Sequence, residues 1–307
     1  MTGHLIHTGQ VVLDLVMRVP ALPPVGGDVF ASDTALLPGG GFNVMAAAAR
    51  AGAGVLYIGG HGTGNFGDTA RAGLAAEGIT AAMAPTPGED TGICVVVVDD
   101  TGERTFVTGS GAESGLDPSE LATVTVTPSD IVYVSGYSLL ATAKAHTLLA
   151  WIETLDGPTV LLDPGPLAIE IDPALWARVL ARTTILSCNA REARLLAGVA
   201  DLRTAAAVLA GRLAPGAAVV VRNGAAGCLI TRDGATEAVP TITVTAVDTN
   251  GAGDAHCGVL AAELLHASDM HTAAVRANIA AALAVTRHGP ATAPTRAEVD
   301  AVLATSL

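Results

Sequence analysis

A chain of 307 residues, half of them hydrophobic and only 3% aromatic, can fill one large aliphatic core. Its net charge of −13 argues against nucleic acid or an acidic membrane surface as a partner, although local cations can still hold a nucleotide. Four cysteines without a C-x-x-C pair, no signal-peptide pattern and no uninterrupted apolar stretch of about 20 residues predict a soluble cytoplasmic protein without a membrane span.

The first hundred residues follow no regular alternation of strands and helices. An apolar run at 5–13 predicts the first strand, and Asp14 directly after it is either a strand-end turn or a carboxylate for ligand hydroxyls. Prolines and a Gly-Gly pair in 19–38 indicate irregular strands and turns outside the main core. The β-branched runs at 93–99 and 104–107 predict a hairpin around an Asp-Asp-Thr-Gly turn.

This hairpin interrupts the order of strands and helices because no helix follows it at once. Together with the proline-rich segment, it predicts a small separate sheet. We therefore divide the chain into a small β lid, residues 13–38 and 92–108, and a main domain, residues 1–12, 39–91 and 109–307.

Two glycine-rich stretches in this half precede helical runs. The stretch Gly39-Gly40-Gly41-Phe42-Asn43 lets a ligand approach bare backbone, and its asparagine either caps the following helix or binds a ligand hydroxyl. Residues 62–67 match G-x-G-x-x-G between a predicted strand and helix. This dinucleotide fingerprint supports an NAD-binding oxidoreductase as an alternative, although it follows the second strand rather than the first.

From about residue 130, short β-prone runs alternate regularly with helical runs. This order predicts the α/β class, a mostly parallel sheet with helices on both faces, in which ligands bind at the carboxyl ends of the strands. Strands are predicted at 131–134, 160–163, 185–188, 219–222, 228–231 and 241–247, and helices at 139–155, 173–181, 190–196, 202–213, 254–266, 271–287 and 296–305.

The stretch from Val247 to Asp254 holds the most informative residues. Gly251 and Gly253 flank an alanine where a predicted strand turns into a helix, and they leave backbone N–H groups uncovered. A helix N-terminus with open N–H groups favours an anion. An ordinary turn explains the glycines, but the carboxylate of Asp254 beside them indicates a general base next to a transferring phosphoryl group.

Two further loops are expected at the same edge of the sheet. Asn189 and Glu192 form either a capping box or oxygen ligands that hold Mg²⁺ through water. Residues 222–227 form a glycine-rich turn that is either a plain hairpin or a floor for a purine. Lys144 is the only lysine and no Walker motif exists, which excludes a P-loop NTPase. Helix termini, metal and arginine would therefore have to meet any phosphate charge.

These motifs resemble those of the ribokinase, or PfkB, family of carbohydrate kinases. Residues 248–254 look like its C-terminal signature, 39–43 with 59–68 like its N-terminal signature, and Asn189-x-x-Glu192 like its N-x-x-E motif; 284–289 are also similar. The resemblance implies a ribokinase-like three-layer α/β/α sandwich with a mostly parallel central sheet and a small β lid. It also implies ATP-dependent phosphorylation of a hydroxyl on a small sugar-like alcohol.

The resemblance further implies a role for each site residue. Asp254 would be the catalytic base, and the amides of Gly251, Ala252 and Gly253 would form the anion hole for the phosphoryl group. Asn189 and Glu192 would organise Mg²⁺ and phosphate, the glutamate through water. The implied nucleotide site comprises Arg222, Asn223, Gly224, Gly227 and Asn278; the sugar site comprises Asp14, Gly40, Gly41 and Asn43; and a K⁺ site comprises Asp248, Asn250, Ala284, Arg287, Gly289 and Ala293, mostly through backbone carbonyls.

The identity of the substrate is less defined. Val12 stands where ribokinases place an asparagine, and no glutamate lies near Tyr137, which argues against ribose itself. Gly41 stands where sugar-phosphate kinases of the family carry a lysine, which favours an unphosphorylated substrate. Ketoses, aldoses and sugar acids stay open, and a nucleoside kinase is the alternative within the family. The exposed face of the lid is a candidate surface for a homodimer.

Overall fold

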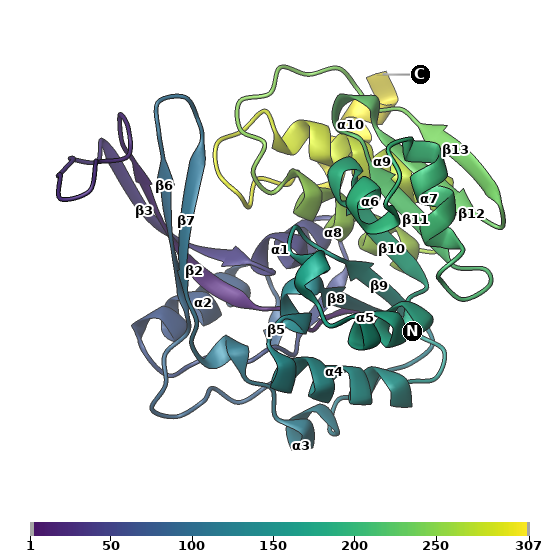
Figure 1. Ribbon diagram of the computed structural model, residues 1–307, viewed down its shortest axis with the longest axis horizontal. Coiled ribbons are helices and arrows are strands. Elements are labelled where there is room, and N and C mark those ends of the chain that lie inside the picture. The colour runs from purple at the N-terminus through teal and green to yellow at the C-terminus, as the bar shows by residue number, and fades with distance from the viewer. Residues whose placement is uncertain (1–2, 306–307) are drawn as a thin grey trace.

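The computed structural model describes residues 3–305, so the outermost residues of the predicted domains lie outside this part. Within it, one main sheet contains nine strands: β1 His4–His7, β4 Gly54–Tyr57, β5 Thr80–Ala81, β8 Ile131–Ser135, β9 Thr159–Asp163, β10 Ile185–Asn189, β11 Ala218–Arg222, β12 Cys228–Arg232 and β13 Ala235–Val239. Their order is β13-β12-β11-β10-β9-β8-β1-β4-β5 (Figure 1). All neighbours from β11 to β5 are parallel, and β12 and β13 are added antiparallel at one edge.

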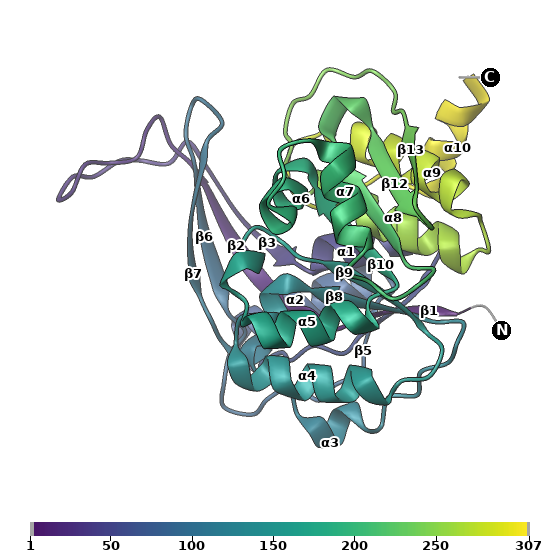
Figure 2. The ribbon, with the colours of Figure 1, turned by 45° about the vertical axis from the view of Figure 1, so that its right-hand side comes forward.

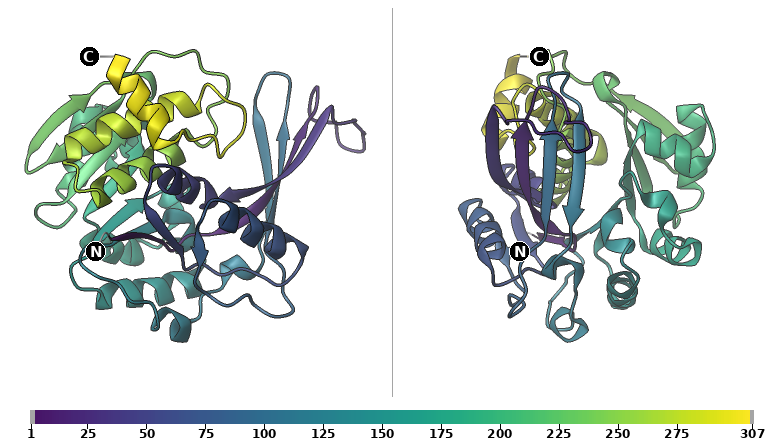
Figure 3. Two further views of the ribbon diagram at one scale, coloured as in Figure 1. Left: turned by 180° about the vertical axis from the view of Figure 1, so that it is seen from behind. Right: turned by 60° about the vertical axis from the view of Figure 1, so that its left-hand side comes forward.

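Helices cover both faces of this sheet (Figures 2 and 3). One layer contains α1 Phe42–Arg50, α2 Asn65–Ala76, α8 Ala252–Leu265, α9 Met270–Ala284 and α10 Arg296–Thr305. The opposite layer contains α3 Pro118–Leu121, α4 Thr142–Thr154, α5 Pro173–Arg182, α6 Ala190–Ala197 and α7 Leu202–Ala210.

The alternation of side chains along the central strands explains the two layers. In β8, Tyr133 packs in the core beneath α8 and α9, whereas Val132 and Val134 pack in the core on the opposite face. Strand β11 repeats this pattern, with its apolar residues divided between the same two cores. Because both faces are buried, these two strands are apolar up to their last residues. The predicted three-layer α/β/α sandwich with a mostly parallel sheet is confirmed.

A second sheet extends from one side of the body (Figure 1). Its four strands within residues 3–305 are β2 Val11–Arg18, β3 Asp33–Gly40, β6 Ile93–Val98 and β7 Arg104–Gly109, in the order β3-β2-β6-β7. The single first strand predicted at 5–13 is wrong, since the chain leaves the main sheet after His7 and enters the second sheet at Val11. The N–H of Gly9, between them, bonds to Nδ1 of His7 rather than to a neighbouring strand.

The strand predicted at 241–247 is also wrong. Pairing of the main sheet ends at Val239, and Pro240 next to it has no N–H for a further ladder bond. Residues 241–247 run as a loop, and the N–H groups of Val247 and Asp248 both bond to the carbonyl of Val285. β-Branched composition alone does not make a strand when the backbone N–H groups bond elsewhere. None of the helices between residues 3 and 305 has the length and hydropathy to cross a membrane.

Candidate active site

The carboxyl ends of three neighbouring strands bring polar side chains together. Asp163 ends β9, Asn189 ends β10 and Arg222 ends β11. Nη1 of Arg222 lies 3.1 Å from Oδ2 of Asp163, and its Nη2 lies 3.8 Å from Oε2 of Glu192. Asp163 is not among the predicted site residues, although a lone carboxylate at the end of a buried strand, level with two predicted site residues, is a usable signal.

Asn189 and Glu192 form a complete capping box at the start of α6. Oδ1 of Asn189 accepts the N–H of Glu192, and Oε2 of Glu192 accepts the N–H of Asn189, both at 2.8 Å. Burial and the neighbouring charge of Asp163 raise the pKa of Glu192. The capping interpretation is therefore right in geometry. It leaves Oε1 of Glu192 without a hydrogen-bond partner among the described residues, so this oxygen can still receive a metal-bound water.

The glycine loop before α8 has the backbone of an open anion site. Gly251 is the N-cap of the helix, with φ of +72°, and no side chain caps the helix start. A Cβ atom at this position would lie 1.8 Å from the carbonyl oxygen of Pro290. Only glycine therefore fits, because both the left-handed backbone and the contact exclude a side chain. The predicted anion-hole residues Ala252 and Gly253 form the first turn, with their N–H groups uncapped by any side chain.

Asp254 in this first turn points toward helix α1. Nδ2 of Asn43 donates a 3.1 Å hydrogen bond to Oδ2 of Asp254. Burial raises the pKa of Asp254 to about 6, opposed by this hydrogen bond and reinforced by the charge of Asp163. A carboxyl group with a pKa near neutrality suits a general base. The structure thus joins the two glycine-rich motifs, 211 positions apart in the chain, at one point.

Asn43 does not cap helix α1. The N-cap is Gly41, with no side-chain hydrogen bond, and Asn43 lies inside the helix. Its Oδ1 is buried and has no hydrogen-bond partner within residues 3–305. Unsatisfied buried acceptors are uncommon, so this oxygen indicates a ligand that donates a hydrogen bond. The structure therefore excludes the helix-capping interpretation of Asn43, and the contact to a ligand hydroxyl stays a prediction.

Asp14 lies on β2 of the second sheet and faces the same site. Burial, followed by the charge of Asp254, raises the pKa of Asp14 to about 6. A Cβ atom at Gly39 would lie 2.1 Å from Oδ2 of Asp14, and one at Gly41 would lie 2.1 Å from Cε1 of His7. Gly40 between them has φ of +61°. Gly39 is therefore needed for the close approach of Asp14, and Gly41 for the close approach of His7.

Replacing Asp14 tests the effect of its charge, which is buried and close to Asp254, on the stability of the protein. Its folded pKa near 6 lies above the ordinary 3.8, so the protonated form favours the fold. This stabilisation is complete below pH 3.8 and is lost as pH rises through 6. We expect Asp14→Asn to stabilise the protein by about 1–3 kcal/mol at pH 7.5 and far less at pH 4. Thermal unfolding at both pH values measures this, with exposed Asp28→Asn as the control. An equal gain at both values would contradict a charge effect.

The predicted nucleotide side of the site is a hairpin and a buried amide. The hairpin interpretation of 222–227 is right: β11 and β12 pair antiparallel, and the N–H of Asn223 bonds to the carbonyl of Gly227. Gly224 and Gly227 have positive φ, as the turn requires. Nδ2 of Asn278 donates to the carbonyls of Val239 and Pro240 at 2.9 and 3.2 Å, which fixes the chain beside the hairpin.

The predicted K⁺ residues lie around the loop before α8. The carboxylate of Asp248 accepts the N–H groups of Asn250 and Gly289 at 2.9 and 3.1 Å and also pairs with Arg104 of the second sheet. The hydroxyl of Thr292 donates to the carbonyls of Ala284 and Gly289 at 3.1 and 3.3 Å.

The remaining predicted members lie nearby. The side chain of Arg287 pairs with Glu298 and donates from Nη1 to the carbonyl of Thr292 at 3.3 Å, and its backbone N–H bonds to the carbonyl of Ala284. Ala293 is buried and packs against Ala284. Arg104 and Thr292 were missed by the sequence analysis, since neither is part of a motif.

The G-x-G-x-x-G match at 62–67 has another explanation. The carboxylate of Asp90 accepts the N–H groups of Phe66 and Gly67 at 3.2 and 2.8 Å, at the start of α2. A Cβ atom at Gly64 would lie 2.1 Å from Oδ2 of Asp90. These glycines serve to dock an internal carboxylate, and the N-terminus of α2 is already occupied by an anion. The structure therefore does not support the dinucleotide interpretation.

Two other observations delimit the site. No group of three or more His, Cys, Asp and Glu side chains within residues 3–305 forms a ready metal site, so a divalent ion would take most ligands from phosphate and water.

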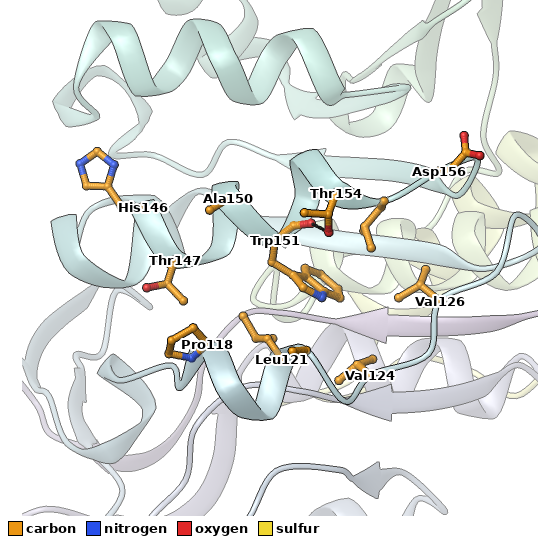
Figure 4. A pocket seen from close by; sticks show the side chains of 12 residues that line it. Pro118, Leu121, Val124, Val126, His146, Thr147, Ala150, Trp151, Thr154 and Asp156 are labelled. Atoms are coloured by element: carbon orange, nitrogen blue, oxygen red, sulfur yellow. Dashed lines mark hydrogen bonds between the residues drawn. The ribbon is translucent and has the colours of Figure 1, made fainter.

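A groove of about 810 Å³ lies between α3 and α4 beside Leu121 and Trp151 (Figure 4). It contains none of the predicted site residues, so the candidate site is the strand edge and not this groove.

The chain is similar to known proteins in sequence and in fold. Residues 4–296 match the family described as pfkB family carbohydrate kinase. The uncharacterized sugar kinase YegV of Escherichia coli is 31% identical over 95% of this chain and 91% of its own length, and the ribokinase of Haemophilus influenzae is 29% identical over 94% and 95%. A solved fructokinase from Vibrio cholerae, with fructose, ADP and a calcium ion bound, superposes with a TM-score of 0.81 at 25% identity and covers 98% of both chains.

Proposed function

Because the chain belongs to the pfkB family of carbohydrate kinases, we propose that it transfers the γ-phosphoryl group of ATP to a hydroxyl of a small unphosphorylated sugar-like alcohol. One observation links this proposed reaction to the residues of the candidate site. Asp254, whose pKa is raised to about 6 chiefly by burial, stands in the first turn of an uncapped helix and is hydrogen-bonded to Asn43. A base and an anion site are thus adjacent, as phosphoryl transfer requires.

The reaction follows from this adjacency. The ionised Asp254 takes the proton of the substrate hydroxyl, whose oxygen forms a bond to the γ-phosphorus. The bond from that phosphorus to the β,γ-bridging oxygen breaks, and its electron pair leaves with ADP. The N–H groups of Gly251, Ala252 and Gly253 stabilise the charge on the phosphoryl oxygens. Asn43 orients Asp254 and offers its free Oδ1 to the substrate.

ATP and a divalent cation are the cofactors of this proposal, with Mg²⁺ as the ion. The solved fructokinase relative contains ADP and a calcium ion. In this chain the free Oε1 of Glu192, with Asn189 beside it, would hold the metal through water. The hairpin 222–227 and Asn278 would line the nucleotide site, because they meet at the same edge of the sheet.

The substrate site is assigned to the other side of Asp254. Asp14, Gly40, Gly41 and Asn43 would bind the hydroxyls of the substrate. Position 41 offers no lysine for a substrate phosphate, and a Cβ atom added there would lie 2.1 Å from Cε1 of His7. A nucleoside is the second candidate, because Phe106 and Tyr137 are 57% and 46% exposed and are free to contact a base, whereas Phe42 is buried.

An ADP-release assay tests this function. We expect ADP to form from ATP and Mg²⁺ only when a suitable acceptor is present. The panel should contain ketoses, aldoses, sugar acids and nucleosides. No stimulation by any member would contradict the proposed reaction, and stimulation by nucleosides alone would favour the second candidate.

We also propose activation by K⁺ at the loop before α8. Two predicted carbonyl ligands, of Ala284 and Gly289, already converge on the hydroxyl of Thr292, so they face one point. K⁺ held there would fix the backbone that leads into Gly251. We expect turnover with K⁺ to exceed turnover with N-methylglucamine at equal ionic strength, and Thr292→Val to reduce the difference. Equal turnover with both cations would contradict this site.

The division into a main domain and a lid also remains a proposal, and with it a homodimer through the lid. The face of the second sheet opposite Asp14 carries Leu36 and Val107, which are 40% and 66% exposed. Burying them in a second copy is favourable. Light scattering should give twice the monomer mass, and Val107→Lys should restore the monomer; a monomeric wild type would refute the homodimer.

We place the protein in the cytoplasm, where its four free cysteines stay reduced, and cell fractionation checks this localisation.

A further inference from the structure

The guanidinium of Arg222 lies directly beneath the glycine loop. A Cβ atom at Gly253 would lie 3.6 Å from Nε, Cζ and Nη2 of Arg222. The side chain is only 13% exposed. No other amino group competes for this place, because the single lysine of the chain, Lys144, donates from its Nζ to the carbonyl of Glu113 at 2.6 Å and is itself buried.

One side of the guanidinium is held in a socket, and the other side is open. Nη1 donates to Ser187 Oγ at 2.8 Å and to Cys257 Sγ at 2.9 Å, and lies 3.1 Å from Oδ2 of Asp163. Nε and Nη2 have no hydrogen-bond partner within the part of the chain that the structure describes; the nearest carboxylate oxygen, of Glu192, lies 3.8 Å from Nη2. The donors without partners are those nearest Gly253.

The charge balance around Arg222 is incomplete. The charge of Asp163 acts on both Glu192 and Asp254 at this strand edge, and Arg222 lies beside Asp163 and Glu192. Three carboxyl groups would repel a triphosphate. If Arg222 only balanced the charge of neighbouring carboxylates, we would expect Nε and Nη2 to be hydrogen-bonded to them. Instead, both donors lack partners beside the predicted anion site.

We propose that Arg222 is a catalytic residue, whose Nε and Nη2 donate to the phosphoryl group as it moves from ATP to the substrate. This inference rests on the proposed kinase function and sharpens the assignment of Arg222 to the nucleotide site. During transfer, the new bond from the substrate oxygen to phosphorus and the breaking bond to ADP leave charge on the three remaining phosphoryl oxygens. Arg222 and the N–H groups of the loop stabilise that charge from adjacent positions.

The fixed fork of arginine matters for this role. Nη1 stays in the socket while Nε and Nη2 bind the phosphoryl group, a division of labour that a single ammonium cannot reproduce. We therefore expect Arg222→Met to lower kcat about 10²–10³-fold and Arg222→Lys to recover only part of the loss, with KM for ATP changing less than about threefold in both. Exposed Arg203→Met is the matched control for charge removal and should keep wild-type kcat.

The experiment measures kcat and KM for ATP in these variants, after unfolding curves have shown that they are folded. Binding of ADP with and without aluminium fluoride, in the presence of the acceptor, is the second readout. We expect Arg222→Met to weaken only the aluminium fluoride complex, which a structural role would not do selectively. If Arg222→Met does not fold, the same two measurements on Arg222→Lys test the role of Arg222.

Three results would overturn the role of Arg222: wild-type kcat in a folded variant, a raised KM for ATP at unchanged kcat, or equal weakening of ADP with and without aluminium fluoride. Each of these presupposes an active wild-type enzyme. A wild type without any acceptor-dependent turnover would instead contradict the proposed function, and the role of Arg222 with it.

Discussion

Asp254→Asn should lower kcat by about 10²–10⁴-fold and leave the affinity for ATP nearly unchanged. The variant keeps the size of the side chain and can still accept the hydrogen bond from Asn43, so the site geometry is preserved. It loses the ability to take a proton from the substrate hydroxyl. Because only the ionised carboxylate is active, wild-type kcat should fall as pH drops through about 6, the raised pKa of Asp254.

Asp269→Asn is the matched control for this change. Asp269 is the N-cap of α9, exposed and far from the site chemistry, and asparagine caps a helix as well as aspartate does. Its kcat should equal that of the wild type. Retention of more than about one tenth of the turnover in Asp254→Asn would show that another group accepts the proton.

Gly251→Ala should abolish the anion site and lower kcat about 10²–10³-fold. The left-handed backbone costs a side chain about 1–2 kcal/mol, and the added Cβ would lie 1.8 Å from the carbonyl oxygen of Pro290. Since the obstructing atoms belong to the backbone of Pro290, the loop has to move, and its N–H groups change direction. Turnover and thermal unfolding of the purified variant measure both consequences.

Gly198→Ala separates strain from loss of the site. Gly198 has φ of +71°, nearly the value of Gly251, but nothing lies within 4 Å of its added Cβ. This control should lose about 1 kcal/mol of stability and keep its turnover. Similar turnover in the two folded variants would contradict the placement of the anion site at Gly251.

Local signals in the sequence predicted much of this site. The glycines at 39–41 and at 251–253 mark backbone that approaches other groups closely, and the loops after β10 and β11 follow from the strand order. Asn43 and Asp254 could be placed at one edge of the sheet, but their hydrogen bond could not, because it joins two helices across 211 positions.

Other parts depend on tertiary contacts that leave no local pattern. Arg104 reaches Asp248 from the second sheet, 144 positions away. From the sequence alone, an arginine at the end of an exposed hairpin is indistinguishable from an ordinary surface residue. The β-prone run at 241–247 failed as a strand because pairing with the main sheet stops at Val239, and the N–H groups of Val247 and Asp248 bond to the carbonyl of Val285 instead. The glycine fingerprint at 62–67 failed because its helix start binds Asp90, a partner that lies 23 positions further on.

The division of roles around Asp254 unites these observations. Residues on one side, Asp14 and Asn43, carry unsatisfied or raised-pKa oxygens suited to hydroxyl groups. On the other side, the loop from Gly251 and the guanidinium of Arg222 offer N–H donors suited to phosphate. An acceptor alcohol and a phosphoryl donor would therefore meet at Asp254, which explains why one carboxylate sits at a helix start that otherwise favours anions.

Phosphorus NMR of the reaction mixture tests the central claim most directly. The protein is incubated with ATP, Mg²⁺ and the acceptor that stimulates ADP release, and the fate of the γ-phosphoryl group is followed. We predict a phosphate monoester of the acceptor that grows in equal amount with ADP and forms about 10²–10⁴-fold more slowly with Asp254→Asn. Appearance of inorganic phosphate without a monoester, or equal monoester formation by Asp254→Asn, would contradict it.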